Sequence, residues 1–281
     1  MADAPQVTIG LLAWNGATTL PACLESVLAQ RRVSWELVAL DNGSRDGSDR
    51  LLAAWCAQHL PPNRWRLVFN RTNRGYAAGM NAIYARSGGA YLCALNQDVA
   101  LHPDYLATLI EGLERQTNWA SAIGRIYRSA QLPADYVSLA RAGDPIGWGR
   151  GRTLDSTGHL LYPERIAVNR RGGEIDGGQD QEEAEVFGVP GMCPVYRRAA
   201  LEAIRMPNGW IWDERFFAYL EDVDLDYRFR TAGWSAGYVP SAVAIHQPHG
   251  SGGRATFGVR FRGHMNRYRL LAKHEAPRSL L

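Results

Sequence analysis

The stretch from Gly209 to Gly233 is the part of the sequence best suited to chemistry. It gathers six carboxylates behind an aromatic run that can wall a cleft and exclude water. Glu221 and Asp222 fall where a helix would begin, a position at which unpaired backbone N–H groups and the helix dipole favour negative charge, and Gly233 falls where a left-handed residue would end that helix. The pattern predicts either shielded carboxylates in a cleft or a solvated acidic cap beside core aromatics. Within it, Asp224 and Asp226 are interpreted as surface or capping residues.

A second set of polar residues follows predicted strands. Asp98 comes two residues after Asn96 at the end of one strand, and His246 ends another. A loop carboxylate of this kind can bind a hard divalent cation, which in turn can bridge the two phosphates of a diphosphate ligand. His246 would then be an additional metal ligand. Taken singly, Asn-x-Asp also fits a turn or a helix cap, and a histidine at a strand end also fits a hydrogen-bonded structural role.

Alternating strands and helices would position these residues. Strands are predicted at 7–12, 36–40, 66–69 and 90–95, with helical patterns between them. This alternation predicts an α/β fold with a parallel sheet, in which ligands bind at the carboxyl ends of the strands. The first hundred residues are therefore interpreted as a nucleotide-binding half, although the sequence has neither G-x-G-x-x-G nor G-x-x-x-x-G-K-[ST].

The second half of the sequence is less regular. Residues 125–186 are rich in Gly, Asp, Arg and Pro, as in the run at 142–151, and predict a loop-rich excursion over the cleft with short strands at most. Strands are expected at 185–189 and 193–196, followed by a helix from about residue 199. Two further strands are predicted at 236–239 and 242–245.

Composition limits the kind of protein. At 281 residues and 46% hydrophobic content, the chain can bury the core of one large domain or of two intimate halves. The sequence shows no apolar run of membrane-spanning length and no secretory signal, which predicts a cytoplasmic protein. Its four cysteines lie far apart in apolar stretches and are predicted to be buried free thiols.

The charge is unevenly distributed along the chain. The net charge is +3, but residues 251–281 hold seven Arg and Lys against one Glu. A basic tail on a mildly acidic body indicates an anionic partner, such as a phosphorylated substrate or the inner face of a membrane, while a solvated basic helix or an oligomer contact fits equally well. A nucleic-acid partner is not expected, because the tail has no recognisable binding module.

Together these motifs resemble family 2 glycosyltransferases of the GT-A fold, and most closely their bacterial rhamnosyltransferase-like branch. The resemblance rests on an ordered series: Trp14-Asn-Gly16, Asp41-Asn-Gly-Ser-Arg-Asp-Gly-Ser48, Asn73-Arg-Gly75, Asn96-Gln-Asp98, Phe216-Phe-Ala-Tyr-Leu-Glu-Asp-Val-Asp-Leu225 and His246. It implies an α/β GT-A fold with a mostly parallel central sheet flanked by helices, and a loop-rich insertion. The implied GT-A domain covers residues 1–250, with a nucleotide-binding half (1–98) and an acceptor and catalytic half (99–250). A basic C-terminal helical extension (251–281) follows.

The resemblance also implies roles for individual residues. Asp222 matches the catalytic base, and Glu221 beside it would orient the acceptor or the base. Asp98 and His246 match the ligands of a divalent cation, Mg²⁺ or Mn²⁺, and a His ligand is more comfortable on Mn²⁺. The residues implied in donor binding are Trp14, Asp41, Arg74, Gly75, Asn81 and Asn96, and candidates for the acceptor side are Trp212 and Met192.

Two of these assignments carry a specific reason. Asp41 would accept a hydrogen bond from the imide N–H of a uracil or thymine ring. Asn96 stands where the strict family motif has an aspartate, and an amide lacks the charge of a carboxylate. Asn96 is therefore expected near the ion or on the sugar rather than as a direct ligand.

The implied reaction is an inverting transfer of a sugar from a nucleotide diphosphate to a hydroxyl of a glycan, lipid-linked or small-molecule acceptor. Thymidine-diphosphate rhamnose (dTDP-rhamnose) is the first donor expected, and a UDP-hexose is the alternative. A sugar-1-phosphate nucleotidyltransferase would need a Gly-rich basic loop near the N-terminus, which residues 7–20 do not supply. A non-catalytic nucleotide-sugar-binding scaffold in glycan assembly stays open as well, and Asn96 is the feature that favours it.

Overall fold

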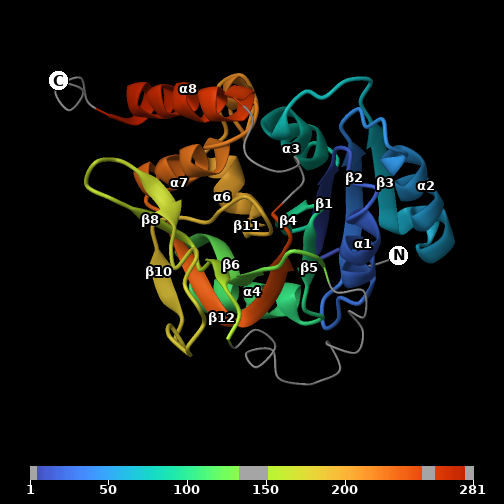
Figure 1. Cartoon of the computed structure of the whole chain (residues 1–281), viewed down its shortest axis with the longest axis horizontal. Helices are drawn as coiled ribbons and strands as arrows, with labels where there is room; N and C mark the ends of the chain where they lie inside the picture. The colour runs from blue at the N-terminus through green and yellow to red at the C-terminus, as the bar shows by residue number, and fades with distance from the viewer. Residues whose placement is uncertain (1–4, 133–150, 249–256, 276–281) are drawn as a thin grey trace.

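The computed structural model describes residues 5–132, 151–248 and 257–275 (Figure 1). Most of the Gly- and Arg-rich run at 142–151, and both ends of the basic tail, lie outside the described residues. All four cysteines are free and buried, as predicted. None of the described helices is both long and apolar enough to cross a membrane.

The N-terminal half forms the parallel part of the sheet. β1 pairs with β2 on one side and with β4 on the other, and β3 lies outside β2. Every residue of β1 and β2 is buried, which explains why most residues of these strands are apolar. The elements confirm the predicted alternation: β1 (Val7–Ala13), α1 (Leu20–Leu28), β2 (Trp35–Asp41), α2 (Ser48–His59), η1 (Pro62–Arg64), β3 (Trp65–Phe69), α3 (Tyr76–Tyr84) and β4 (Tyr91–Asn96).

The C-terminal half extends the same sheet, and its strand directions are mixed. The order is β10-β12-β6-β11-β4-β1-β2-β3, with β11 antiparallel to both β4 and β6, while β12 runs parallel to β6. A separate ribbon is formed by β8 and β9. The remaining elements are β5 (Val99–Leu101), α4 (Tyr105–Arg115), β6 (Trp119–Arg128), β7 (Leu154–Ser156), β8 (His159–Leu161), β9 (Ala167–Asn169), β10 (Ala184–Val186), β11 (Val195–Arg197), α6 (Arg198–Ala203), η2 (Glu214–Phe216), α7 (Glu221–Thr231), β12 (Ser235–His246) and α8 (Phe257–His274).

Two strands differ from the predictions. β6 is ten residues long with nine of them buried, although residues from 125 onward were expected to be loop-rich. The two strands predicted at 236–239 and 242–245 are one strand, β12, whose register shifts between Tyr238 and Val243. Pro240 lies inside this shift, and a proline has no N–H to donate to a strand ladder. The strand therefore continues past the proline by way of an irregular pairing.

α8 packs across α7 and the loop that precedes it (Figure 1). The side-chain amide of buried Asn266 donates to the carbonyls of Phe216, Ala218 and Tyr219 at 2.8–2.9 Å. This loop contains three non-glycine residues with positive φ, namely Phe217, Tyr219 and Leu220. Such backbone is strained, and the hydrogen bonds from α8 help to hold it in place.

Candidate active site

The carboxyl ends of β1, β2 and β4 present the first group of predicted residues. Asp41 ends β2, and its Oδ2 accepts hydrogen bonds from the N–H groups of Gly43 and Ser44 at 3.1 and 3.0 Å. Its Oδ1 is buried and finds no hydrogen-bond partner within the described residues. A buried acceptor of this kind is suited to an N–H donor from a ligand. Trp14 follows the end of β1, the strand that pairs with β2, and its side chain is 40% exposed.

Gln97 holds the loop that carries Trp14. Its side-chain oxygen accepts from the Trp14 N–H at 2.8 Å, and its side-chain nitrogen donates to the Trp14 carbonyl at 3.0 Å. Gly16 lies so close that a Cβ there would sit 2.0 Å from Gln97 Oε1. Sequence analysis gave no role to Gln97, the middle residue of Asn96-Gln97-Asp98. The structure shows that it holds the backbone of Trp14.

The segment at Arg74 and Gly75 is held by side-chain amides. Asn42 accepts from the Arg74 N–H at 3.1 Å and donates to the Gly75 carbonyl at 3.1 Å. Gly75 has φ of +87°, and a Cβ there would lie 2.5 Å from the carbonyl oxygen of Phe217. Glycine is therefore required both by the backbone conformation and by the approach of the 217 loop. Arg74 is exposed at this edge.

Asp98 and His246 meet at the far ends of β4 and β12. The His246 Nε2 lies 3.5 Å from Asp98 Oδ1, and its Nδ1 is 2.7 Å from Asp155 Oδ2. Burial opposes the charged imidazole, but the hydrogen bond to Asp155 and the negative charges of Asp98 and Asp155 outweigh it and raise the pKa of His246 to about 9. Asp155 was not predicted. It lies in the region interpreted as loop-rich, and it orients the histidine in the way that carboxylates orient histidine ligands of metals.

Asp222 is tied to the bridging segment, residues 187–192, which runs from β10 to the end of β4. Its Oδ2 accepts the Gly191 N–H at 2.9 Å, and Tyr76 donates its hydroxyl to the Gly191 carbonyl at 2.7 Å. The next residue, Met192, accepts the backbone N–H of Asn96 at 2.9 Å. The structure thus connects α7, the start of α3 and the end of β4 through two consecutive residues.

Asp224 and Asp226 are fully buried, so their interpretation as surface or capping residues was wrong. Asp224 is surrounded by Arg228, Lys273 and His274, at 2.7–2.9 Å for the closest pairs. Asp226 receives the Val189 N–H at 3.1 Å and pairs with His159 at 2.7 Å. Four basic groups therefore satisfy two carboxylates that a helical pattern alone would place at the surface.

Glu221 is buried beside Asp222, and its Oε2 has no hydrogen-bond partner among the residues that the structure describes. Burial, followed by the negative charge of Asp222, raises the pKa of Glu221 well above its usual value. Protonation of Glu221 is therefore more favourable than for a free glutamate, while the Asp222 side chain is 18% exposed.

Three of the residues predicted to bind donor or acceptor, Asn81, Trp212 and Met192, make contacts within the protein. Asn81 bonds through both ends of its amide to the 211–214 segment, accepting from Ile211 and Trp212 and donating to the Trp212 carbonyl at 2.8–3.1 Å. Trp212 is 1% exposed and packs edge-on against Tyr84 and Tyr196, so it presents no face to an acceptor ring. Met192 is also buried, and it contributes its backbone.

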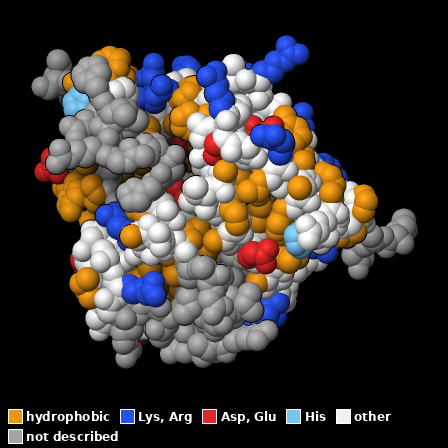
Figure 2. Space-filling view, turned by 45° about the vertical axis from the view of Figure 1, so that its right-hand side comes forward, with side chains coloured by type: hydrophobic (Ala, Val, Ile, Leu, Met, Phe, Trp, Pro, Cys, Tyr) orange, Lys and Arg blue, Asp and Glu red, His pale blue; other side chains and the backbone are white. Residues whose placement is uncertain are grey.

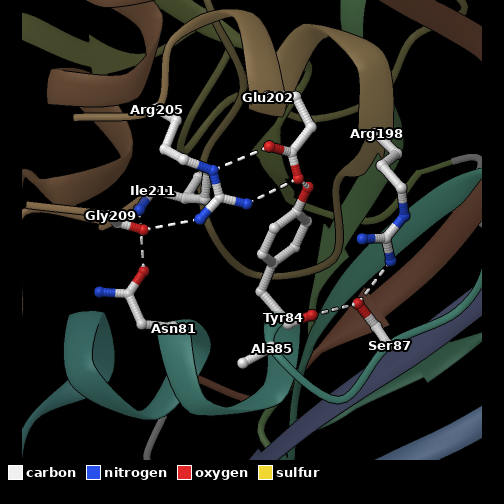
Figure 3. Close-up of a pocket in the computed structure, with 9 residues that line it drawn as sticks. All are labelled: Asn81, Tyr84, Ala85, Ser87, Arg198, Glu202, Arg205, Gly209 and Ile211. Atoms are coloured by element: carbon white, nitrogen blue, oxygen red, sulfur yellow. Dashed lines mark hydrogen bonds and ion pairs between the residues drawn. The ribbon is translucent and has the colours of Figure 1, made fainter. Parts of the chain in front are cut away.

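Asn81 instead lines a pocket of about 230 Å³ between the end of α3 and α6 (Figure 3). Its polar side chains face one another: Arg205 pairs with Glu202, and Arg198 donates to Ser87 at 2.6 Å. Because Ser87 precedes β4, this pocket lies at the opposite end of that strand from Asp98.

The N-terminal half of the sheet is parallel, and polar side chains gather at the carboxyl ends of its strands. The sequence profile described as "Glycosyl transferase family 2" matches residues 8–205, which is more than two thirds of the chain. The chain therefore belongs to glycosyl transferase family 2 and is a glycosyltransferase, which confirms the predicted family, fold and enzyme class.

Individual relatives agree with this assignment. An N-acetylglucosaminyl-diphospho-decaprenol L-rhamnosyltransferase of Mycobacterium tuberculosis is 29% identical over 82% of this chain and 71% of its own length. The succinoglycan biosynthesis protein ExoO of Rhizobium meliloti is 36% identical over 38% of this chain and 29% of its own.

Solved structures show the same fold at low sequence identity. GalNAc-T7 with UDP, GalNAc and Mn²⁺ superposes with a TM-score of 0.67 at 13% identity, over 97% of this chain and 48% of that one. The mannosyltransferase PcManGT of Pyrobaculum calidifontis, with GDP-Man and Mn²⁺, superposes with a TM-score of 0.60 at 16% identity, over 99% of this chain and 68% of that one.

The raised pKa of buried Glu221 predicts a pH-dependent stability. A carboxyl whose pKa is higher in the folded state binds its proton more tightly there, so its contribution to stability falls as pH rises above about 4.3, the usual value for Glu. Glu221→Gln keeps the neutral shape and does not titrate. The free energy of unfolding of the variant should increase relative to that of the wild type as pH rises from 4 to 8. The expected increase is about 1.4 kcal/mol for each unit by which the pKa of Glu221 is raised.

Denaturant unfolding at several pH values measures this difference, and Glu182→Gln, at an exposed glutamate, is the matched control. A difference between Glu221→Gln and wild type that stays constant with pH would show that Glu221 is ionised in the folded protein.

Proposed function

We propose that this glycosyltransferase transfers rhamnose from dTDP-rhamnose to a hydroxyl of a glycan or glycoconjugate, with inversion at the anomeric carbon. The observation that carries the proposal is the 3.5 Å approach of His246 to Asp98, at the strand end to which the bridging segment ties Asp222. Residues more than a hundred positions apart are thereby gathered at one edge of the sheet. The similarity to a mycobacterial rhamnosyltransferase supports rhamnose as the sugar.

The donor would lie along the ends of β1, β2 and β4. The unpaired Oδ1 of Asp41 suits the imide N–H of thymine or uracil, and the exposed face of Trp14 would flank the base. Arg74 would lie along the diphosphate. Because both pyrimidines offer the same N–H, this site fits a UDP-hexose as well, which is the second candidate donor.

The residues at Asp98 fit a divalent cation shared with the diphosphate. Asp98 Oδ1 is buried without a hydrogen-bond partner in the described part of the chain and faces the imidazole Nε2 of His246. Within those same residues, no group of three or more His, Cys, Asp or Glu is arranged to hold a metal ion. The protein would therefore supply two ligands, Asp98 and His246, and the donor would complete the set. A bound Mg²⁺ or Mn²⁺ supplies a positive charge that stabilises the departing nucleoside diphosphate.

Asp222 would be the general base. The acceptor oxygen attacks the anomeric carbon, its proton passes to the Asp222 carboxylate, and the bond from that carbon to the diphosphate oxygen breaks on the opposite face. Asp222 is suited to this role because its side chain is partly exposed and anchored by the Gly191 N–H. Anchoring matters, since holding base and substrates in a reactive geometry provides much of the rate.

Replacing Asp222 by Asn tests the base. The variant keeps the shape of the side chain but cannot accept a proton, so kcat for sugar transfer should fall by about 10²–10⁴-fold. Nucleotide binding, measured by calorimetry, should be unchanged. Asp49→Asn, in the first turn of α2, is the control for the substitution itself. Turnover at the wild-type rate in Asp222→Asn would remove Asp222 from this role.

A thermal-shift panel tests the donor and the metal. The panel contains dTDP, UDP and GDP, each with and without Mg²⁺ or Mn²⁺. A specific ligand at a hundred times its Kd stabilises the folded state by about 2.7 kcal/mol. We expect dTDP with metal to raise Tm most, and Asp98→Asn to lose the metal-dependent part of the shift.

A larger shift with UDP would exchange the proposed donor for a UDP-hexose. Shifts that are independent of metal and unchanged in Asp98→Asn would contradict the proposed metal site.

The acceptor is proposed to be lipid-linked and reached through α8. The name of the mycobacterial relative specifies a diphospho-decaprenol acceptor. Phe261, Met265 and Tyr268 are 58%, 39% and 64% exposed at helical spacing on α8, next to exposed Arg267 and Arg269. Basic side chains gather along the upper edge of the molecule (Figure 2), the edge at which α8 lies in Figure 1. Apolar and basic side chains on one helix suit an anionic membrane surface.

Vesicle co-sedimentation tests this contact. The protein should bind phosphatidylglycerol vesicles, lose most of that binding in high salt, and bind phosphatidylcholine vesicles weakly. The triple variant Phe261→Ser, Met265→Ser and Tyr268→Ser should bind anionic vesicles roughly tenfold or more weakly, because three apolar contacts are lost. Equal binding by this variant and by wild type would exclude α8 as the membrane contact.

A further inference from the structure

His159 lies between Asp222 and Asp226, two carboxylates of α7. Its Nδ1 is 2.7 Å from Asp226 Oδ2, and its Nε2 is 3.9 Å from Asp222 Oδ2. His159 opens β8, and none of the sequence motifs includes it. Its backbone is fixed as well, since its N–H donates to the Gly188 carbonyl at 2.8 Å and its carbonyl accepts from Phe187 at 3.2 Å.

The same bridging segment determines where Asp226 lies. A Cβ at Gly188 would be 1.8 Å from Asp226 Cγ, so a glycine is needed for the carboxylate to pack against the backbone. The Val189 N–H then takes up Asp226 Oδ1, leaving Oδ2 for His159. Both oxygens of Asp226 are thus occupied in orienting a histidine ring whose other nitrogen faces Asp222.

Packing alone does not explain why the trio of His159, Asp222 and Asp226 lies together. Burying a histidine and a carboxylate is unfavourable unless they are paired, and such a pair is often no more stable than apolar side chains of the same volume. The Asp222 oxygens also differ in their surroundings. Oδ2 is flanked by the Gly191 N–H and by His159, whereas Oδ1 receives the N–H of neighbouring Val223.

We propose that His159, oriented by Asp226, is a positioning residue for Asp222, holding its Oδ2 so that Oδ1 faces the acceptor hydroxyl. This inference rests on the proposed role of Asp222 as the base. The proton of the acceptor goes to Asp222, and His159 neither gives nor takes a proton in the step. The ring Nε2 of the histidine instead lies 3.9 Å from a carboxylate that must stay ionised until the acceptor arrives.

The electrostatics of the trio agree with this arrangement. Burial opposes charge on His159, but its hydrogen bond with Asp226 and the charges of Asp226 and Asp222 raise its pKa above the usual value. Burial raises the pKa of Asp226 to about 6 despite its pairing with His159. Other titratable groups near Asp222 and Asp226 are Glu221, Tyr76 and Tyr196.

Two conservative variants separate the functions of the two ring nitrogens. The side-chain amide of Asn overlays the histidine Nδ1, so His159→Asn keeps the contact with Asp226 and loses the group that faces Asp222. The amide of Gln overlays Nε2, so His159→Gln keeps a donor toward Asp222. We expect His159→Asn to lower kcat by between about tenfold and a hundredfold, with KM for the donor unchanged, and to alter the pH profile of kcat. His159→Gln should recover part of the loss.

His59→Asn, on α2, is the control variant and should keep wild-type kinetics. The proposal is overturned if His159→Asn has the kcat and pH profile of wild type. It is also overturned if His159→Asn and His159→Gln lose activity equally and only in proportion to a lower Tm, because the role is then structural.

A measurement on Asp222→Asn keeps the test independent of how the His159 variants fold. The ring ¹⁵N resonances of His159, assigned by their loss in a His159 variant or by contact with Asp226, should titrate differently in Asp222→Asn than in wild type. Unchanged titration would show that the two side chains are not coupled and would overturn the inference. If Asp222→Asn retains sugar transfer, the proposed base is wrong instead, so the two failures are distinguishable.

Discussion

A match of spacing between a helix and an extended segment fixes the geometry of this enzyme. Asp222 and Asp226 lie four residues apart on one face of α7, a rise of about 6 Å, and the N–H groups of Val189 and Gly191 that they receive lie two residues apart, about 6.6 Å in extended chain. The bridging segment is therefore held against α7 at two points. Met192, the last residue of this segment, accepts the backbone N–H of Asn96, so α7 and the end of β4 are fixed relative to each other.

The surroundings of the four acidic residues at the start of α7 differ, and they distinguish the one that we propose as the base. Burial raises the pKa of Glu221, Asp224 is paired with Arg228 and the end of α8, and Asp226 is paired with His159. Asp222 alone among these four combines partial exposure with an anchoring backbone hydrogen bond. The sequence presents four equivalent carboxylates, and tertiary structure makes them different.

Local patterns were sufficient for elements whose burial follows from their own sequence. The apolar runs of β1, β2 and β4, the left-handed end of α7 at Gly233, and the strand-end positions of Asp98 and His246 were all predictable. Long-range partners were not: nothing near Asp155 or His159 indicates that each faces a residue 67–91 positions away. The structural contacts of Asn81 with the 211–214 segment, and of the Trp212 indole with Tyr84 and Tyr196, could not be read from the sequence for the same reason.

The hydrogen bonds from Asn266 to the 216–219 loop, and those from Lys273 and His274 to Asp224, give α8 a part in assembling the active site. The residues proposed to bind the donor, and the proposed base Asp222, all precede this helix in the sequence. Without α8, the loop with three left-handed residues has no amide from this helix to hold it, and buried Asp224 lacks two of its cationic neighbours. α8 therefore completes the surroundings of the 216–219 loop and of Asp224, and a chain lacking this helix would lack both sets of contacts.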